Sequence, residues 1–458
     1  MNIIKSPTRD VNSPEFIIDK IIRSLLSCKL ECLDYHFHFF LMLKFSLLTF
    51  ILFYVSFCFG QAPIKDYVIS QAKQISSIDP SDGDYSDLHA LGDAIGKSRI
   101  VMLGEQDHGD APTFLAKTRL IKYLHEKLGF NILAFESDFF GLNFGFDKLE
   151  KSKPKIDTFL RKNIFPIWTN CHTCQNLFYN YIPSTFQTDN PLLISGFDNQ
   201  MVLNFSSKQL SYYLDSVLQS LNIFLTKQQN YRTEILPLID SLKYYSFKDI
   251  ANYAKCETFL NQIKNQISGK LNESDFWMMV INNLIAENKT YMVYKIDKII
   301  ASNIRDEQMA LNLKWLMNIK FPNERIIVWA ANAHVAKYMD SLGKSGRKLI
   351  SMGSFFTNTK RYFDETYVLG FTSYEGEAGR LGFDIYSVRK PKTNGFENWI
   401  NKSYNYSFVD FKNYNSKYPD QPQLFYLKGL GHNTAFQKDW TKVFDGIFFI
   451  REMYPCKR

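Results

Sequence analysis

The sequence predicts an α/β protein of three layers, α/β/α, with helices on both faces of a mostly parallel sheet and a large helical insertion. Two observations carry this prediction. Short runs that are apolar at every position, typical of strands buried on both faces, alternate with longer amphipathic segments. Between residues 206 and 320 the apolar runs stop and only amphipathic segments remain. With 458 residues, 45% of them hydrophobic, the chain can bury a large core.

The predicted elements follow from these two periodicities. Apolar runs predict strands at 100–103, 130–135, 191–197, 325–333, 348–353, 367–371, 382–387 and 445–450. Helical spacing predicts helices at 66–77, 111–128, 209–225, 234–242, 256–268, 273–289 and 299–319. The 111–128 segment is the clearest helix, because Pro112 stands near its first turn and its apolar residues recur on one face.

The N-terminal part is predicted to lie outside the mature fold. We expect residues 1–41 to be an upstream extension that precedes the true start at Met42. Residues 42–60 have the pattern of a secretory signal peptide, with an apolar stretch over 45–57 that is short for a bilayer span and the small Gly60 at the cleavage position. An uncleaved membrane anchor is the competing interpretation. The mature protein is therefore predicted to be exported, periplasmic or secreted, with no stable membrane span.

The mature chain is predicted to have a core and a cap. Residues 61–205 and 321–458 would form the α/β core, and 206–320 would form the helical insertion that covers the cleft and defines substrate access. The formal charge of +8 is mild and scattered, and no Arg-rich stripe or nucleic-acid module occurs. We therefore expect a small-molecule substrate and no nucleic-acid partner, while the oligomeric state stays open.

Four cysteines remain downstream of residue 60: Cys171, Cys174, Cys256 and Cys456. Cys171 and Cys174 have the spacing of a redox motif or half a zinc site, but no second cysteine pair completes such a site. In an exported protein this spacing predicts a local disulfide between Cys171 and Cys174 or two unreacted thiols.

A carboxylate and an imidazole follow the first buried strand. Glu105 and His108 are three residues apart and are flanked by Gly104 and Gly109, which free the backbone. The carboxyl ends of parallel strands are where ligand crevices form in open α/β sheets. Two unlike titratable groups at such a place suit a base and its orienting partner better than a helix cap.

Ionisable residues also follow three further predicted strands: Glu136 after 130–135, Asp198 after 191–197 and His334 after 325–333. If these strands are parallel in one sheet, all these side chains gather with Glu105 and His108 around a single cleft. Each also has an ordinary structural interpretation, because a carboxylate after a strand often caps the next helix and a single histidine often only makes hydrogen bonds.

Two cations lie on the helix that follows the Glu105 and His108 pair. Lys117 and Arg119 could be solvated surface residues. One of them turned toward the cleft could instead bind an anionic substrate or stabilise an oxyanion.

With these residues assembled, the chain resembles the erythromycin esterase family over nearly all of its mature part. The resemblance depends on separated motifs in the right order: Gly104-Glu-Gln-Asp-His-Gly109, Gly129-Phe130 with Phe135-Glu136, Ser195-Gly-Phe-Asp198 with Gln200, Arg305-Asp-Glu-Gln-Met-Ala310 with Asn312, Trp329 through Asn332 to His334, and Phe444-Asp-Gly446. It implies a hydrolase that needs no metal or other cofactor and that opens the lactone ester of macrolides. In that scheme His108 is the general base that activates water, and Glu105, Glu136 and His334 match active-site residues of the family.

Three departures from the family pattern concern the substrate. Members that act on macrolides typically have a histidine where this chain has Ala331, an arginine where it has Lys117 and a glutamate where it has Pro112. Ala331 removes an ionisable group, and Lys117 lacks the planar fork of arginine. These departures weaken the prediction of a macrolide substrate more than they weaken the prediction of an ester hydrolase.

Two alternatives remain open at the level of sequence. His108, His334, Glu105, Glu136 and Asp198 could together form a metal site, which would make the protein a metal-dependent hydrolase on the same cleft. The chain could also be a non-catalytic, exported ligand-binding protein, an interpretation that Ala331 encourages.

Overall fold

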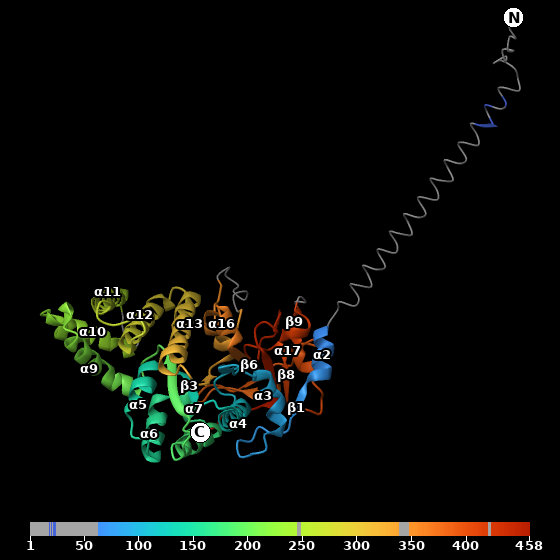
Figure 1. Ribbon diagram of the computed structural model, residues 1–458, viewed down its shortest axis with the longest axis horizontal. Coiled ribbons are helices and arrows are strands. Elements are labelled where there is room, and N and C mark those ends of the chain that lie inside the picture. Colours follow the sequence, from blue (N-terminus) through green and yellow to red (C-terminus); the bar gives the residue numbers. More distant parts are fainter. Residues whose placement is uncertain are drawn as a thin grey trace, which may run out of the picture. The chain divides into compact units, whose positions relative to one another are not determined.

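A mostly parallel sheet organises the chain, as the computed structural model shows (Figure 1). The structure describes residues 18, 20, 22–23, 63–244, 249–338, 348–419 and 423–458. The strand order is β1-β8-β11-β6-β2-β5-β3-β4, and β7 pairs with β6. The strands are β1 (Lys73–Ile75), β2 (Ile100–Leu103), β3 (Ile132–Asp138), β4 (Leu193–Asp198), β5 (Ile326–Trp329), β6 (Thr366–Ala378), β7 (Tyr386–Ser387), β8 (Tyr406–Asp410) and β11 (Gly446–Met453). A separate antiparallel pair consists of β9 (Phe425–Leu427) and β10 (Phe436–Lys438).

Along the order β11-β6-β2-β5-β3-β4 each strand pairs in parallel with the next, and β8 and β1 extend the sheet beyond β11 by antiparallel pairing. The late strand β5 lies between the early strands β2 and β3, with Val101 opposite Ile327 and Ile327 opposite Leu133. The ends of β2, β5, β3 and β4 are consequently neighbours at one edge of the sheet.

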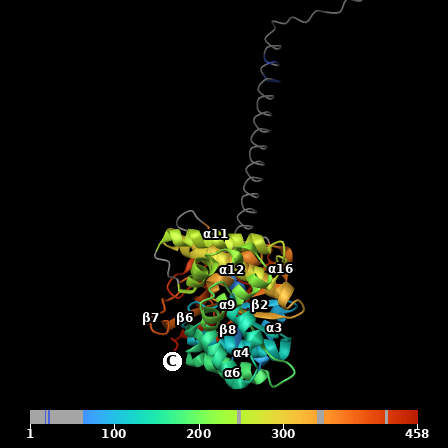
Figure 2. The same ribbon diagram turned by 90° about the vertical axis from the view of Figure 1, so that its left-hand side faces the viewer.

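Helices cover both faces of the sheet, as the three-layer prediction requires. Ile100 and Met102 of β2 belong to one buried cluster, and Val101 and Leu103 belong to another on the opposite face. Figure 2 places α11 and α12 on one side of the strands and α4 and α6 on the other. The helices are α2 (Pro63–Gln71), α3 (His89–Ile95), α4 (Ala111–Leu128), α5 (Phe146–Lys148), α6 (Lys153–Asn163), α7 (Pro166–Thr169), α8 (Ile182–Thr185), α9 (Asn204–Ser220), α10 (Leu236–Asp240), α11 (Ile250–Ile267), α12 (Phe276–Tyr294), α13 (Lys298–Trp315), α14 (Asn332–Val335), α15 (Met352–Phe356), α16 (Lys360–Asp364) and α17 (Phe411–Lys417).

In its described residues, the segment between β4 and β5 contains helices joined by turns and no strand. In it α11 packs on α12, α12 packs on α13, and α13 lies against β4 and α15. These helices gather at one end of the fold in Figure 1. Residues 64–458 nevertheless form one compact unit, so the helical segment is continuous with the rest of the fold.

Two strand predictions are wrong. Residues 348–353 form no strand, because the side chain of Asn303 bonds the backbone of Lys348 and Ile350, and α15 begins at Met352. Of 382–387 only β7 is a strand. The short strands β1 and β8, which the sequence did not predict, pair with each other at the antiparallel end of the sheet.

Both expectations for Cys171 and Cys174, a local disulfide or two unreacted thiols, are also wrong. Cys171 bonds Cys456 instead, with 5.6 Å between their Cα atoms, and Cys174 is a buried free thiol. Backbone bonds run beside this link, from Ala111 to Tyr454 and from His172 to Lys457. The C-terminal segment therefore fastens the start of α4 to the turn after α7.

The predictions for the N-terminal leader concern residues that lie mostly outside the described part of the chain. Of residues 1–62 only 18, 20, 22 and 23 are described, and they are helical. The upstream extension over 1–41 and the signal peptide over 42–60 stay predictions. Across the described residues, every helix is too short or too polar to cross a membrane.

Candidate active site

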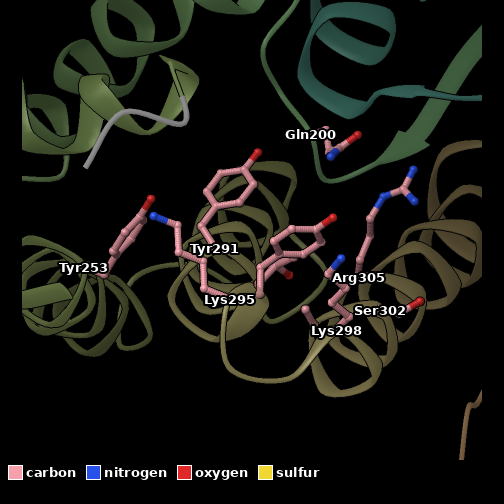
Figure 3. Close-up of a pocket in the computed structure, with 10 residues that line it drawn as sticks. Gln200, Tyr253, Tyr291, Lys295, Lys298, Ser302 and Arg305 are labelled. Atoms are coloured by element: carbon pink, nitrogen blue, oxygen red, sulfur yellow. The ribbon is translucent and has the colours of Figure 1, made fainter. Parts of the chain in front are cut away.

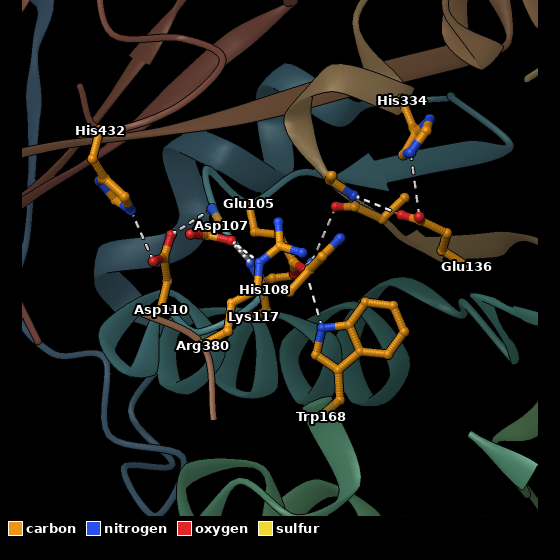
Figure 4. A network of polar contacts seen from close by, with 12 residues as sticks. Glu105, Asp107, His108, Asp110, Lys117, Glu136, Trp168, His334, Arg380 and His432 are labelled. Carbon is orange, nitrogen blue, oxygen red and sulfur yellow. Dashed lines mark hydrogen bonds and ion pairs between the residues drawn. The ribbon is translucent and has the colours of Figure 1, made fainter. Parts of the chain in front are cut away.

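Five of the predicted site residues lie at the edge where the parallel strands end. Figure 4 shows Glu105, His108, Glu136 and His334 among them. Glu105 and His108 occupy the loop between β2 and α4, Glu136 lies near the end of β3, and Asp198 ends β4. His334 lies on α14, directly after β5.

Glu105 is completely buried and holds three donors. Its Oε1 accepts from the indole Nε1 of Trp168 at 3.0 Å and contacts Nδ1 of His108 at 2.7 Å, while its Oε2 accepts from Lys117 Nζ at 2.7 Å. A carboxylate held by an ammonium group can only accept, so Nδ1 of His108 must carry the proton. The lone pair of His108 is then on Nε2, on a side chain that is 15% exposed.

Lys117 is the buried counter-ion of Glu105. Its side chain is fully buried, and its Nζ lies 4.0 Å from the centre of the Trp329 ring. Burial lowers the pKa of Lys117 below its usual range, although Glu105 opposes this shift. The ammonium group of Lys117 thus binds Glu105, the carboxylate that contacts His108.

A second cluster forms around Arg305 of α13. Its guanidinium donates to both carboxylate oxygens of Asp198, at 3.1 and 2.6 Å, and to Oε1 of Glu136 at 3.0 Å. Burial disfavours the charged form of Glu136, but His334 and Arg305 outweigh it and lower the pKa of Glu136 to about 2. Glu136 is therefore ionised, and it shares one guanidinium with Asp198.

His334 differs from His108 in that both its ring nitrogens are engaged. Nδ1 lies 2.7 Å from Oδ1 of Asp306, and Nε2 lies 3.3 Å from Oε1 of Glu136. Burial opposes protonation of His334, but Asp306 and Glu136 outweigh it and raise its pKa to about 9. Nη1 of Arg305, 3.2 Å from Nε2, would suit a neutral ring. We favour the imidazolium, because two carboxylates flank it.

The segment after β5 joins the two clusters. The amide of Ala331 donates to Oε2 of Glu136 at 3.0 Å, and the amide of Asn332 donates to the carbonyl of Glu105 at 2.8 Å. A side chain at Gly104 would collide with Asn332, since its Cβ would lie 1.9 Å from Oδ1. At Ala331, where the family pattern has a histidine, this chain contributes only the backbone amide that donates to Glu136.

Arg119 does not belong to this site, contrary to our prediction. Its guanidinium is buried against Asp87 at 2.9 Å and the carbonyl of Ser77 at 2.8 Å. Two positions along a helix turn by about 200°, so Arg119 and Lys117 point to opposite sides of α4.

Three residues of the site were not among the predicted ones: Trp168, Arg305 and Asp306. Arg305 and Asp306 lie in a motif that carried the family resemblance, but on a helix, where a search of strand ends does not reach. Trp168 lies on the short helix α7, and nothing in its surrounding sequence indicates a contact with Glu105.

The described residues contain no group of three or more His, Cys, Asp or Glu side chains placed to hold a metal ion. The chemistry of the candidate donors also fits a divalent cation poorly, because Lys117 and Arg305 already neutralise the carboxylates.

A cavity of about 480 Å³ adjoins the Arg305 cluster. It lies among the C-terminal part of α12, the N-terminal part of α13 and Gln200, which follows β4. Arg305 is part of its lining (Figure 3). The cavity thus connects the helical segment with the polar network.

The family model for erythromycin esterase matches residues 125–453. The chain belongs to the erythromycin esterase family. The matched region includes Glu136, Asp198, Arg305 and His334 and begins downstream of Glu105 and His108. The place of the latter two in the site therefore depends on the geometry above.

Individual relatives agree with this assignment. The Bacillus subtilis (strain 168) protein YbfO, whose name proposes a hydrolase, is 26% identical over 318 residues, which are 65% of this chain and 70% of that protein. Erythromycin esterase type II of Escherichia coli is 23% identical over 427 residues, 81% of this chain and 93% of that protein. The family and these names point to a hydrolase.

Solved structures share the fold. A Bacillus cereus protein superposes with a TM-score of 0.65 at 17% identity, covering 86% of this chain and 98% of that one. An erythromycin esterase, EreC, in the open conformation of a histidine-to-asparagine mutant, gives a TM-score of 0.59 at 16% identity, with 84% and 98% covered.

Proposed function

We propose that this protein is an exported carboxylic-ester hydrolase in which His108 activates water. One observation carries the proposal: Glu105, itself fixed by Lys117 and Trp168, holds the Nδ1–H of His108, which leaves Nε2 as a base on a partly exposed ring. This is the arrangement that general-base catalysis needs, because the carboxylate orients the ring and stabilises the imidazolium that forms.

The reaction follows from these groups. Nε2 of His108 takes a proton from water, and the hydroxide attacks the ester carbonyl carbon. The carbonyl oxygen becomes an oxyanion, for which the Arg305 guanidinium, with its side chain 19% exposed, is the nearby cationic donor, while His334 adds positive charge beside it. The tetrahedral intermediate then expels the alkoxide, which takes the proton back from His108. Oxygens and protons balance with water as the only co-reactant.

The proposed substrate is a carboxylic ester or a macrolide lactone, so that inactivation of an antibiotic is one biological outcome. The name of the E. coli relative supports a lactone. Export is supported by the predicted signal peptide and by the Cys171–Cys456 disulfide, since such bonds persist in oxidising compartments. N-terminal sequencing of the exported protein tests the start at Met42 and the cleavage after Gly60.

The test is a panel of aryl esters, alkyl esters and macrolide lactones, assayed with and without a chelator. We expect turnover that the chelator does not affect, and a loss of about 10²–10⁴ in kcat for His108→Ala with the fold retained. Lys127→Ala, on the last turn of the same helix α4 and outside the site, is the control.

The other outcomes contradict the proposal in separate ways. Unchanged turnover in His108→Ala removes this residue from the mechanism. Loss of activity with chelator, restored by one divalent ion, favours the metal-dependent hydrolase. If no ester is cleaved but a ligand raises the melting temperature, the protein is a binding protein instead.

A further inference from the structure

The cavity beside Arg305 has an uneven chemical lining. Lys295, Lys298 and Arg305 supply positive charge, and the rings of Tyr253, Tyr291 and Tyr294 supply aromatic surface. No carboxylate is among the described residues that line it. Figure 3 shows Tyr253 at one end, Arg305 and Gln200 at the other, and Tyr291 and Lys295 between them.

The two lysines are not neutralised by neighbouring acids. In the part of the chain that the structure describes, neither Lys295 nor Lys298 forms an ion pair, and Lys298 instead lies 5.5 Å from the centre of the Tyr294 ring. Arg305 differs, because Asp198 and Glu136 already bind it. The positive potential of the cavity therefore comes mainly from the two lysines, of which Lys295 lies in the middle of the cavity and Lys298 near Ser302 (Figure 3).

A further carboxyl group, that of Glu287, contacts the lining at Tyr291 and is held toward its neutral form. Glu287 is buried beneath Tyr291, whose hydroxyl donates to its Oε1 at 2.8 Å. Burial raises the pKa of Glu287 well above its usual range, and the bond from Tyr291 opposes this only in part. Glu287 therefore offsets little of the positive charge of the lysines.

From this lining we propose that the cavity selects esters that carry an anionic group on a ring. The tyrosines would stack against the ring, Lys295 and Lys298 would attract the anion, and the ester would extend past Arg305 toward His108. This inference rests on the proposed hydrolase function and names its substrate class. Exposed charge pairs are weak one by one, so we expect a preference of about tenfold from the two lysines together.

The test uses three 4-nitrophenyl esters of phenylacetic acid that differ only at the para position of the acyl ring. The first carries a carboxylate, the second a neutral carboxamide and the third a trimethylammonium group. For the full-length protein we expect kcat/KM to fall in that order, with a ratio of anionic to neutral ester of about ten at low salt that shrinks at high salt.

Variants assign the preference to the cavity. In the double variant Lys295→Gln with Lys298→Gln, the ratio of anionic to neutral ester should fall to about one through KM. The control is Lys289→Gln, which removes one positive charge from the nearby helix α12, at a position that pairs with Glu257 and does not line the cavity. It should keep the wild-type ratio.

Failure of the inference and failure of the proposed function look different. If all three esters are cleaved with equal kcat/KM, or if the double variant keeps the preference, the selection is overturned while the hydrolase stands. If no ester is cleaved, the proposed hydrolase function is wrong. The anion preference of the cavity is then tested separately, by comparing how far the anionic and the neutral phenylacetamide analogues raise the melting temperature. Anion-selective stabilisation that the double variant loses supports the cavity's preference, and equal stabilisation overturns it.

Discussion

The two histidines of the site, His108 and His334, have the same kind of partner at Nδ1 and differ in what surrounds Nε2. Each has Nδ1 2.7 Å from a carboxylate, Glu105 for His108 and Asp306 for His334. The second nitrogen of His334 faces Glu136 and Arg305, whereas that of His108 has no partner in the described part of the chain. Two carboxylates in direct contact raise the pKa of His334 to about 9, whereas only Glu105 contacts the ring of His108 directly among the described residues. The number of carboxylates in direct contact therefore distinguishes the proposed base from the second histidine of the site.

The largest effect is expected from breaking the support of His108. Glu105→Gln leaves the buried Lys117 ammonium without its counter-ion, which costs about 3–5 kcal/mol of the free energy of unfolding, as measured in urea. The double variant Glu105→Gln with Lys117→Met removes both charges and should recover most of that loss. Equal stability of the single variant and the wild type would show that Lys117 does not depend on Glu105.

A second prediction concerns the charge of His334. Because its folded pKa of about 9 is raised above the ordinary value of 6.5, protonated His334 stabilises the fold fully below pH 6.5, and this contribution is lost as the pH rises through 9. Between pH 6.5 and 10 the free energy of unfolding should fall by on the order of 3 kcal/mol.

His334→Gln provides the comparison for this pH dependence. The variant lacks the titrating ring, so its stability should be flatter over the same pH interval. A wild-type curve that is already flat there would show that His334 is neutral, and the distinction between the two histidines would then lose its electrostatic basis.

The smallest effect is expected at Trp168. Trp168→Phe removes the indole N–H that donates to Glu105, a bond to a charged group worth about 2 kcal/mol. Trp329→Phe is the matched control, because its indole Nε1 is buried with no partner in the described structure. If both variants lose the same stability and the same kcat, the bond to Glu105 contributes nothing beyond ring volume.

The strand ends of the site could be predicted because each strand there is apolar on both faces and is followed at once by an ionisable residue. The clearest helix, 111–128, has the predicted bounds, since its periodicity, Pro112 and the αL Gly129 agree. Arg305 was not predicted as a site residue because its partners Asp198 and Glu136 lie more than a hundred positions away, and only the packing of α13 on β4 brings them together.

Two errors have a different physical origin. The run 348–353 is apolar enough for a strand, but side chains of α13 take up its backbone groups, and sequence spacing does not reveal such partners. The cysteine prediction favoured the near neighbour Cys174 over Cys456, because proximity along the chain was the only distance that the sequence offered.

The Cys171–Cys456 link bears on when the site is completed. Cys456 follows every helix and strand that the structure describes, and the link spans 285 positions. Closing so long a loop removes about 5 kcal/mol of entropy from the unfolded chain in the polymer model. The turn that carries Trp168 is locked to the C-terminal segment only after the last strand has been synthesised. The bond therefore cannot form until every helix and strand that the structure describes is present in the chain.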